Sequence, residues 1–361
     1  MKKLYVTATR DNDGKTVVTM GLMEQLRRMF PRVAFIKPLG LKDVRAPGYE
    51  VDEDALLMER AFSLHAHIQD MSPVTVDRTS IDEFTRPERQ AELMSQVKES
   101  FERVSRDADL VMIEGTGHAA VGSVFGMSNA RIASELGAKV ILVTSGGIGH
   151  PLDEVAINMA FFDKHGVEVV GVIFNKARSH EVDKIKTVGK AVLERLGTRL
   201  AGVVPYNRVV DAPTMMDVLE RLQGRMVLGE KHLGKRIESI QVGAMSAHNA
   251  LPRLKGRALL ITAGDRTDLL LAAAVRSLTA REEAPVAGVV LTGGITPDPK
   301  ILDILKQLPV AVIAVKDDSY STAARVKSMT TRVSASDRVK IDLIKDMVGR
   351  YVEVEEFVGL L

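Results

Sequence analysis

Gly14, Lys15 and Thr16 follow one another shortly after the first apolar segment of the chain, and their types and order suit phosphate chemistry. A phosphate-binding loop needs backbone N–H groups that converge on the phosphate oxygens, a helix N-terminus behind them, a lysine and a metal-binding hydroxyl. This tripeptide supplies the end of such a loop, between a predicted strand and a predicted helix. The alternative is an ordinary strand–turn–helix connection in which Gly14 makes the turn and Lys15 is solvated.

The rest of this loop departs from the standard pattern. The residue five positions before the glycine is Thr9 rather than a second glycine, and with one extra spacer residue the position falls on Ala8. Asp11 and Asp13 lie inside the loop. Because carboxylates repel a triphosphate unless Arg10 or a metal ion offsets them, we expect these two acids to crowd and weaken the site.

Three further polar residues occupy positions where ligands are often bound. Lys37 follows the second predicted strand and so lies on the carboxyl edge of the sheet, although it is equally explained as an edge lysine before a turn. Asp54 opens a helical segment, where acids are most often simply first-turn acids. Asn175 follows a later strand and can contact a base edge through its amide, but asparagine at a strand end often only turns the chain.

Glu114 is the most specific of the acidic candidates. An apolar strand at residues 110–113 delivers it to the carboxyl edge of the sheet, and Gly115 and Gly117 then keep the backbone clear for a ligand. A carboxylate at this position can hold Mg²⁺ opposite Thr16, because hard cations prefer oxygen ligands.

The elements that must position these residues are short apolar segments separated by helical patterns. The strands lack strict alternation, as expected when helices cover both faces of a parallel sheet. Alternation of strand and helix predicts a doubly wound, mostly parallel α/β sheet. The predicted strands of this first sheet are residues 4–7, 33–36, 110–113, 140–144, 167–174 and 201–204.

A second, smaller α/β set begins after residue 224. Its predicted strands are residues 240–242, 258–262, 286–291 and 310–315, and its predicted helices are residues 267–278, 299–305, 322–329 and 337–348. We therefore predict two domains, residues 1–224 and residues 225–361, with the C-terminal helix in the second.

Composition excludes several classes of function. The 361 residues carry a formal net charge of +2, no Cys, no Trp and 4% aromatic residues, which argues against a nucleic-acid surface, disulfides, iron–sulfur clusters and thiolate zinc sites. A 45% hydrophobic content is enough for a sizeable core. The N-terminus lacks the pattern of a signal peptide, and no apolar run reaches the roughly 20 residues of a membrane span. We expect a soluble cytoplasmic protein with no nucleic-acid or membrane partner.

Taken in order, the candidate residues resemble the dethiobiotin-synthetase-like P-loop family over about residues 1–222. The resemblance implies a sheet of the P-loop NTPase type. The matching segments are the strand and loop from Ala8 to Gly14-Lys15-Thr16, then Lys37-Pro38, Asp54-Ala55-Leu56, Glu114-Gly115-Thr116-Gly117 and Asn175.

This resemblance implies the cofactors. The loop would hold ATP through Gly14, Lys15 and Thr16, and Asn175 would contact the adenine. The related enzymes place their substrate across a dimer interface, so a homodimer is the implied assembly.

The same resemblance implies the metal site and the chemistry. Thr16, Asp54 and Glu114 would hold Mg²⁺. Lys15 and Lys37 would be the catalytic residues, near the phosphates and the point of phosphoryl transfer to a small-molecule carboxylate.

Three positions differ from the family pattern. The first loop glycine of the family is Ala8 here, and a loop hydroxyl is replaced by Asp11. A serine that helps to hold substrate after the Lys-Pro pair has no counterpart in residues 39–42. We therefore do not expect activity in the biotin pathway.

The C-terminal part resembles a DRTGG domain over about residues 225–331. The segments that carry the resemblance are residues 242–245, 262–268, 291–294 and 317–320. Asp265 and Arg266 lie at a strand-to-helix junction, where they either bind an adenine nucleotide or form a salt bridge that fixes the turn. DRTGG domains are associated with regulation, which implies a nucleotide-sensing or dimer-forming role.

The two domains in this order resemble the N-terminal region of long bacterial phosphate acetyltransferases. The acetyl-transferring domain does not follow before Leu361, so we do not expect transferase activity. The leading hypothesis is a Mg-ATP-binding protein that activates a carboxylate or hydrolyses ATP, with a regulatory DRTGG domain. The rival is a non-catalytic regulatory protein that senses a nucleotide or metabolite, and a third hypothesis is a scaffold that has lost ligand binding.

Overall fold

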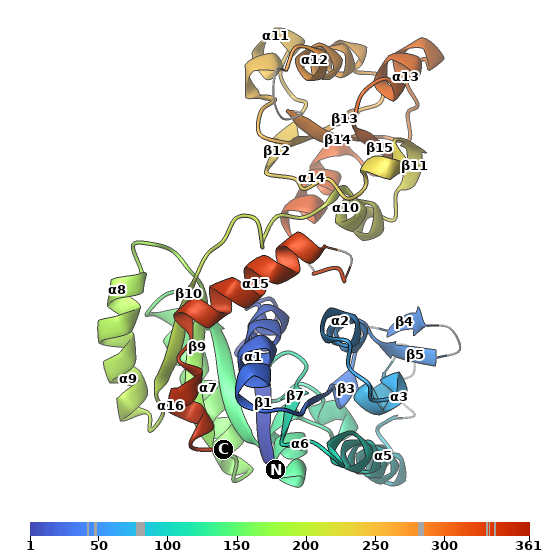
Figure 1. Cartoon of the computed structure of the whole chain (residues 1–361). Coiled ribbons are helices and arrows are strands. Elements are labelled where there is room, and N and C mark those ends of the chain that lie inside the picture. Colours follow the sequence, from blue (N-terminus) through green and yellow to red (C-terminus); the bar gives the residue numbers. More distant parts are fainter. Residues whose placement is uncertain are drawn as a thin grey trace. The chain divides into compact units, whose positions relative to one another are not determined.

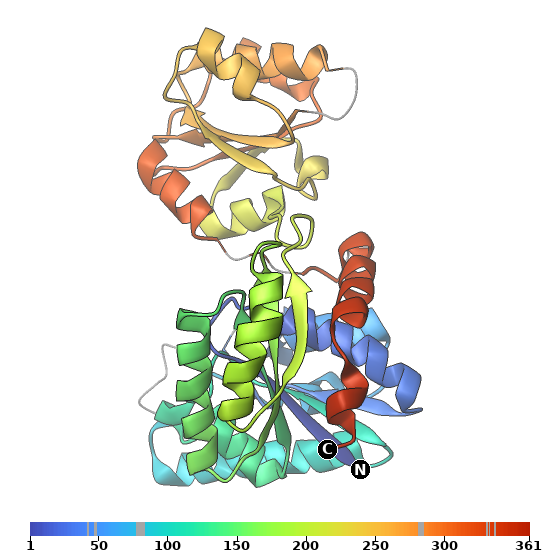
Figure 2. The same cartoon turned by 90° about the vertical axis from the view of Figure 1, so that its left-hand side faces the viewer.

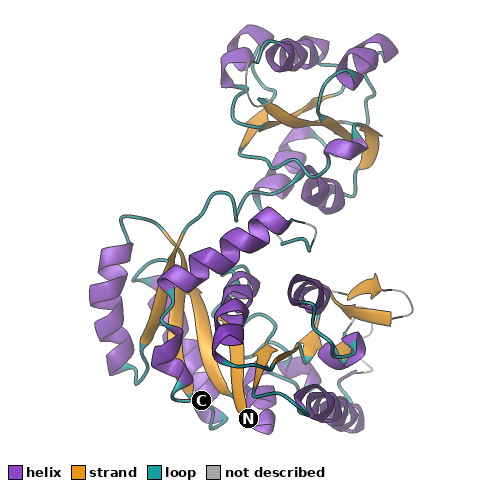
Figure 3. Ribbon diagram, in the orientation of Figure 1, coloured by secondary structure: helices purple, strands orange, loops and turns teal. Residues whose placement is uncertain are grey.

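The computed structural model describes the whole chain except residues 42, 47, 48, 77–83, 281–284, 330, 332 and 336, and for residues 43–46 and 49 it describes the backbone only. The chain forms two compact units. The first unit comprises Met1–Asn207 together with Val333–Leu361, and the second comprises Arg208–Arg332. Strands and helices alternate along both units, as Figure 3 shows.

The first unit is built on a parallel sheet with the strand order β10-β9-β8-β1-β7-β2. This arrangement confirms the predicted doubly wound sheet. Strand β1 lies in the middle with β7 and β8 on either side, so the loop that follows β1 lies beside the ends of both neighbours. The strands are β1 (Lys2–Ala8), β2 (Val33–Ile36), β7 (Leu110–Glu114), β8 (Lys139–Ser145), β9 (Val169–Ala177) and β10 (Leu200–Pro205).

Helices cover both faces of this sheet (Figures 1 and 2). Helix α1 lies on one face, while α6 and α7 lie on the other. Two small strand pairs, β3 with β6 and β4 with β5, lie outside the main sheet. The helices are α1 (Lys15–Met29), α2 (Glu53–Phe62), α3 (Ile68–Met71), α5 (Pro87–Ser105), α6 (Asn129–Leu136), α7 (His150–Lys164), α8 (Val182–Lys184) and α9 (Lys190–Arg195), and the small strands are β3 (Leu39–Gly40), β4 (Asp43–Ala46), β5 (Tyr49–Asp52) and β6 (Val74–Thr75).

The end of the chain returns to the first unit. Helix α15 (Arg338–Tyr351) packs along α1, and α16 (Val354–Val358) follows it down the same face (Figure 1). Gly21 of α1 makes this close approach feasible, because a Cβ there would collide with the side chain of Val348. Glu24 of α1 pairs with Lys345 of α15 at 3.1 Å.

This packing differs from the predicted division into residues 1–224 and 225–361. The sequence predicted a helix at residues 337–348, but helical spacing does not reveal which other helix it packs against. The boundary also lies earlier than residue 224, because α10 (Met215–Leu222) packs into the core of the second unit.

The second unit has a five-stranded sheet with the order β11-β15-β14-β13-β12. Strand β11, which the sequence analysis did not predict, is antiparallel to β15, and the other four strands are parallel. Alternate residues of the central strands enter two apolar clusters, one on each face. The elements are β11 (Arg225–Leu228), β12 (Ser239–Val242), α11 (Ala247–Ala250), β13 (Ala258–Ala263), α12 (Thr267–Leu278), β14 (Val286–Thr292), α13 (Pro299–Lys306), β15 (Ala311–Ala314) and α14 (Ser319–Lys327).

In the part of the chain that the structure describes, no helix is both long enough and apolar enough to span a bilayer.

Candidate nucleotide and metal site

The loop between β1 and α1 ends in a left-handed glycine. Gly14 has φ 84° and precedes the first residue of α1, and no side chain caps this helix. A Cβ at Gly14 would collide with the amide nitrogen of Asn175, so only glycine fits there. Helix α1 therefore begins with backbone N–H groups that no capping side chain satisfies, which is the arrangement that favours an anion.

Asp13 is turned into the loop rather than out of it. Its side-chain Oδ2 accepts hydrogen bonds from Thr9 Oγ1 at 2.7 Å and from the backbone N–H of Arg10 at 2.9 Å. Burial raises the pKa of Asp13 above its usual value, and the hydrogen bond from Thr9 partly opposes that rise. The expectation that both loop acids would crowd a phosphate therefore changes, since Asp13 is held within the loop and Asp11 alone is exposed.

Arg10 extends from the loop to helix α7. Its guanidinium contacts Glu154 at 2.7 Å and Ser145 Oγ at 2.8 Å, whereas its closest approach to the Asp13 carboxylate is 3.9 Å. Glu154 also pairs with His150 at 2.8 Å. The charge of Arg10 is thus directed mainly to α7, not to the acid beside it in the loop.

Glu114 gathers the predicted site residues around one carboxylate oxygen. Its Oε1 lies 2.7 Å from Lys15 Nζ and 3.0 Å from Lys37 Nζ, and it accepts a 3.3 Å hydrogen bond from Thr16 Oγ1. The side chain is 0% exposed, and its second oxygen, Oε2, is buried without a hydrogen-bond partner among the described residues. Two residues of α1 and one residue that follows β2 therefore converge on the end of β7.

Lys37 lies among three carboxylates. Its Nζ pairs with Asp54, with Asp52 at 3.3 Å and with Glu114, and its side chain is 3% exposed. Burial by itself would lower the pKa of Lys37, but the three acids together raise it well above the usual value. The ammonium is thus charged and surrounded on several sides by acids.

Asp52 is a member of this cluster that the sequence analysis missed. It caps α2 by accepting the N–H of Asp54 at 2.9 Å, and its backbone N–H donates to Ser72 Oγ at 2.8 Å. Burial raises the pKa of Asp52, and the charge of Lys37 opposes that rise. An acid two positions before a first-turn acid is a capping pattern, so the sequence did contain a signal for its position.

Asn175 contacts the loop rather than standing apart from it. Its Nδ2 donates to the backbone oxygens of Asp13 at 2.9 Å and Gly14 at 3.4 Å. Both bonds use Nδ2, so the side-chain carbonyl oxygen, Oδ1, takes no part in them. The residue lies at the carboxyl end of β9 and is 2% exposed.

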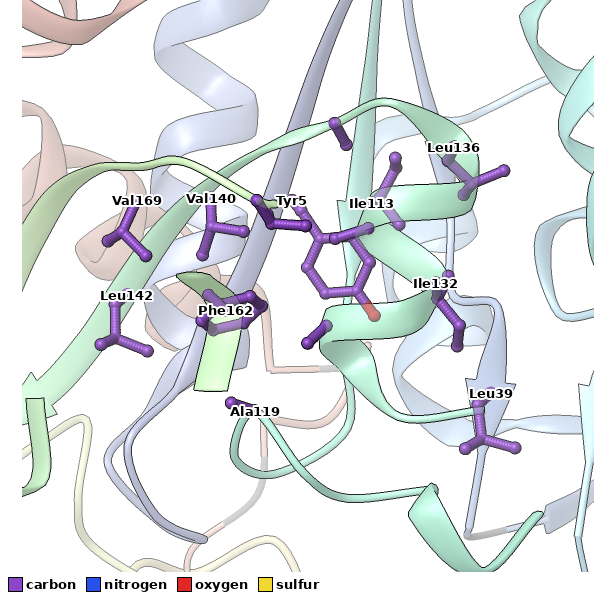
Figure 4. Close-up of a cluster of buried hydrophobic side chains, with 14 of the residues drawn as sticks. Tyr5, Leu39, Ile113, Ala119, Ile132, Leu136, Val140, Leu142, Phe162 and Val169 are labelled. Carbon is purple, nitrogen blue, oxygen red and sulfur yellow. The ribbon is translucent and has the colours of Figure 1, made fainter. Parts of the chain in front are cut away.

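The glycine-rich turn after Glu114 is held by Asn129, a second residue that the sequence analysis missed. The Oδ1 of Asn129 accepts from the Tyr5 hydroxyl at 2.8 Å and from the N–H of Thr116 at 3.0 Å. Its Nδ2 donates to the carbonyls of Thr116 at 2.7 Å and His118 at 2.6 Å. Tyr5 lies in the apolar core beside Ile113 (Figure 4), and burial raises its pKa. The turn is therefore fixed from beneath by a buried polar pair.

The donor set suits Mg²⁺ only in part. Thr16, Asp54 and Glu114 offer one hydroxyl and two carboxylates, and Oε2 of Glu114 has no hydrogen-bond partner among the described residues. Within the described ranges, no three Asp, Glu or His side chains form a ready-made metal cage. Mg²⁺ is commonly held by one or two carboxylates together with substrate phosphates and water, and Asp54 and Glu114 are two carboxylates of that kind.

Arg266 of the second unit holds two segments together. Its guanidinium pairs with Asp268 through two 2.9 Å bonds and donates to the carbonyls of Gly243 at 2.9 Å and Met245 at 2.8 Å. Of the two predicted roles, these contacts match the one that fixes a turn, although the acid is Asp268 rather than Asp265. Asp265 is exposed.

Known protein families match both parts of the chain. A family model described as an AAA domain matches residues 2–214, and a DRTGG domain model matches residues 217–329. The phosphate acetyltransferases of Nitrosomonas europaea and Pseudomonas aeruginosa are 26% and 25% identical to the chain, and each alignment covers 98% of this chain and 51% of the relative. The chain thus spans about half the length of these curated relatives.

One solved structure that aligns is that of the CBS and DRTGG domains of the regulatory region of Clostridium perfringens pyrophosphatase. It is 22% identical, covers 38% of this chain and 61% of that chain, and has a TM-score of 0.26, which is too low to define a common fold. The family matches cover each part of the chain with its own model. The chain therefore belongs to the AAA-domain family of P-loop proteins and carries a DRTGG domain behind it, a combination consistent with the N-terminal region of long phosphate acetyltransferases.

Proposed function

We propose that the first unit binds ATP with Mg²⁺ at the loop that joins β1 to α1, and that it uses the nucleotide to activate a carboxylate or hydrolyses it. The observation that carries this proposal is that the N–H groups at the end of the loop have no capping side chain. Helix α1 begins without a side-chain cap, Asp13 is turned away into the loop, and Lys15 stands at the start of the helix. The match to an AAA domain over residues 2–214 supports it.

Each residue of the site has a role in this proposal. The N–H groups at the start of α1 bind phosphate oxygens. The Lys15 ammonium, which contacts Glu114 in this structure, pairs with a phosphate oxygen instead when ATP binds. Thr16, Asp54 and Glu114 are the residues that would hold Mg²⁺, which when bound neutralises phosphate charge. The catalytic contribution is positioning and electrostatic stabilisation rather than covalent chemistry.

Asn175 is consistent with an adenine base. Its Nδ2 is committed to the loop carbonyls, so the part of the amide left for a base is Oδ1, an acceptor. Adenine presents an amino donor at the position where guanine presents a carbonyl acceptor. We therefore propose ATP rather than GTP as the nucleotide.

The test is the affinity for ATP with Mg²⁺, measured by isothermal titration calorimetry on the full chain. We expect Lys15→Ala to weaken binding by at least about tenfold, because a charge-assisted contact with phosphate is lost. Lys300→Ala, which removes an exposed lysine from α13, is the matched control and should bind like the wild type. A wild-type protein without affinity, or equal affinity of wild type and Lys15→Ala, would contradict the proposal.

A specific observation also favours the second candidate, a non-catalytic sensor of a nucleotide or metabolite. Lys37 is 3% exposed and occupied by three carboxylates, so in this arrangement it offers no ammonium to an acceptor substrate. ATP binding without turnover would support the sensor. Turnover that survives Lys15→Ala would instead remove the assigned site. Under either candidate we propose a regulatory role for the DRTGG domain and a homodimeric assembly, which sedimentation velocity measures.

A further inference from the structure

The centre of the acidic cluster is occupied by a side chain of the protein itself. Lys37 Nζ lies 3.0 Å from Glu114 and 3.3 Å from Asp52, and it also contacts Asp54. Glu114 and Asp54 are two of the residues that would hold the metal. The Lys37 ammonium therefore lies between the carboxylates of Asp54 and Glu114, where a divalent cation would bind.

Glu114 gives an independent sign that this site takes a further ligand. Its Oε2 is buried and has no hydrogen-bond partner in the described part of the chain, while Oε1 carries contacts from Lys15, Lys37 and Thr16. A buried carboxylate oxygen without a donor is unfavourable unless a donor or cation arrives. One oxygen of the carboxylate thus has polar partners, and the other has none among the described residues.

We propose that Lys37 is a built-in counter-ion that competes with the divalent cation for Asp54 and Glu114. This inference rests on the proposed function, which assigns that cation to the nucleotide. A fixed ammonium neutralises part of the acidic charge and repels a second cation at close range. The metal ion alone therefore binds weakly to the wild-type protein, and the phosphates of the nucleotide are needed to bring it in.

Lys15 does not have this role, although it contacts the same oxygen of Glu114. Its side chain is more exposed, at 11% against 3% for Lys37, and among the described residues Glu114 is the one carboxylate with which it pairs. Removal of Lys15 leaves Lys37 between the acids. Lys15→Met is therefore the matched control for Lys37→Met: each variant takes one ammonium from Glu114, but only the second opens the acidic cluster.

The test is a titration of the full chain with Mn²⁺ and no nucleotide, followed by electron paramagnetic resonance of the free ion. We expect Lys37→Met to bind one Mn²⁺ at least about tenfold more tightly than the wild type. Lys37→Arg, which keeps the charge, should remain close to the wild type, and Lys15→Met should gain clearly less affinity than Lys37→Met, because Lys37 still lies between the acids. Mn²⁺ should also raise the melting temperature of Lys37→Met more than that of the wild type.

A folded Lys37→Met protein that binds Mn²⁺ no more tightly than the wild type would overturn the inference. Removal of the ammonium leaves buried acids unpaired and can prevent folding. In that case Lys37→Met is combined with Asp52→Asn, which keeps a capping side chain on α2 and removes one acid. Tighter Mn²⁺ binding by this double variant than by Asp52→Asn alone supports the inference, and equal binding overturns it.

The outcome is separable from that of the proposed function, because no nucleotide enters this titration. If Lys37→Met gains Mn²⁺ affinity but the wild type does not bind ATP, the counter-ion role of Lys37 is supported and the proposed nucleotide site is contradicted. ATP binding by the wild type with no gain in Lys37→Met would do the reverse.

Discussion

The two acids of the loop between β1 and α1 have different surroundings, and the difference decides how the loop can meet an anion. Asp13 is 4% exposed and holds the turn through Thr9 and the N–H of Arg10. Asp11 is exposed. Because the Asp13 carboxylate is bonded inside the loop, Asp11 is the acid of this loop that is exposed to an approaching anion.

The buried position of Asp13 has a consequence for stability against pH. Its pKa is raised in the folded protein, so the folded state retains the proton to higher pH than the unfolded chain does. The contribution of Asp13 to the free energy of unfolding is therefore largest below its unfolded pKa of about 3.9. This contribution is lost as pH rises through the folded pKa of Asp13. Asp13→Asn keeps an acceptor for Thr9 but carries no charge. We expect its stability relative to the wild type to improve from pH 4 to pH 7.

Urea unfolding at several pH values measures this difference. Asp11→Asn is the control, because it removes an exposed acid from the same loop, and the change with pH should be larger for Asp13→Asn than for this control. If the two variants show the same pH dependence, Asp13 does not have the burial that the structure gives it.

At the residue scale, the sequence predicted several polar side chains that lie close together in the structure, but not how they are held. Lys15, Thr16 and Glu114 follow strand or loop patterns that are local in the chain, and the structure brings them together. Asn129 was missed, because its contacts with Tyr5 and Thr116 span 124 and 13 residues and leave no local pattern. Lys37 was expected near phosphates, and its burial among acids depends on the fold.

At the scale of elements, the most consequential contact is that of α15 with α1, the helix that begins at the candidate phosphate loop. Gly21 and Gly349 bring the two helices together, since a Cβ at the first would collide with Val348 and a Cβ at the second with the amide of Gln25. Lys2 adds a link to the end of the chain through bonds to the carbonyls of Val358 and Leu361, both at 2.9 Å. Residues far apart in the sequence thus support the helix that carries Lys15.

Gly21→Ala tests this contact. In a free helix the change would stabilise by about 1 kcal/mol, because alanine has the higher helix propensity. Here the methyl group meets Val348, so we expect a loss of about 1–3 kcal/mol in the free energy of unfolding. Guanidinium unfolding measures it. Val348→Ala in the same chain should recover part of the loss, and a gain of stability in the single variant would show that α15 does not pack there.

The sequence predicted the existence of most elements better than their partners. The strands of the first sheet and the C-terminal helix were expected within a few residues of their observed bounds, because apolar periodicity is local. Strand β11 was missed, since only two residues separate its four residues from α10 and their pairing with β15 is long-range. The placement of the C-terminal helix in the second domain was wrong for the same reason, because α15 packs on the first unit.

At the scale of the whole molecule, the second unit interrupts the first in the chain. The chain leaves the first unit after Asn207 and returns at Val333. The family matches follow the chain order, with the AAA domain over residues 2–214 and the DRTGG domain over residues 217–329. Neither family match extends over the returning helices, which pack on the first unit.

The most direct test of the central claim, that the start of α1 binds a polyphosphate, is a crystal structure of the full chain grown with Mg-ATP. The account predicts phosphate density against the backbone N–H groups of residues 14–16, with Lys15 Nζ moved from Glu114 to a phosphate oxygen. A protein that crystallises with the nucleotide absent from this loop, or bound elsewhere with Lys15 still on Glu114, would contradict it.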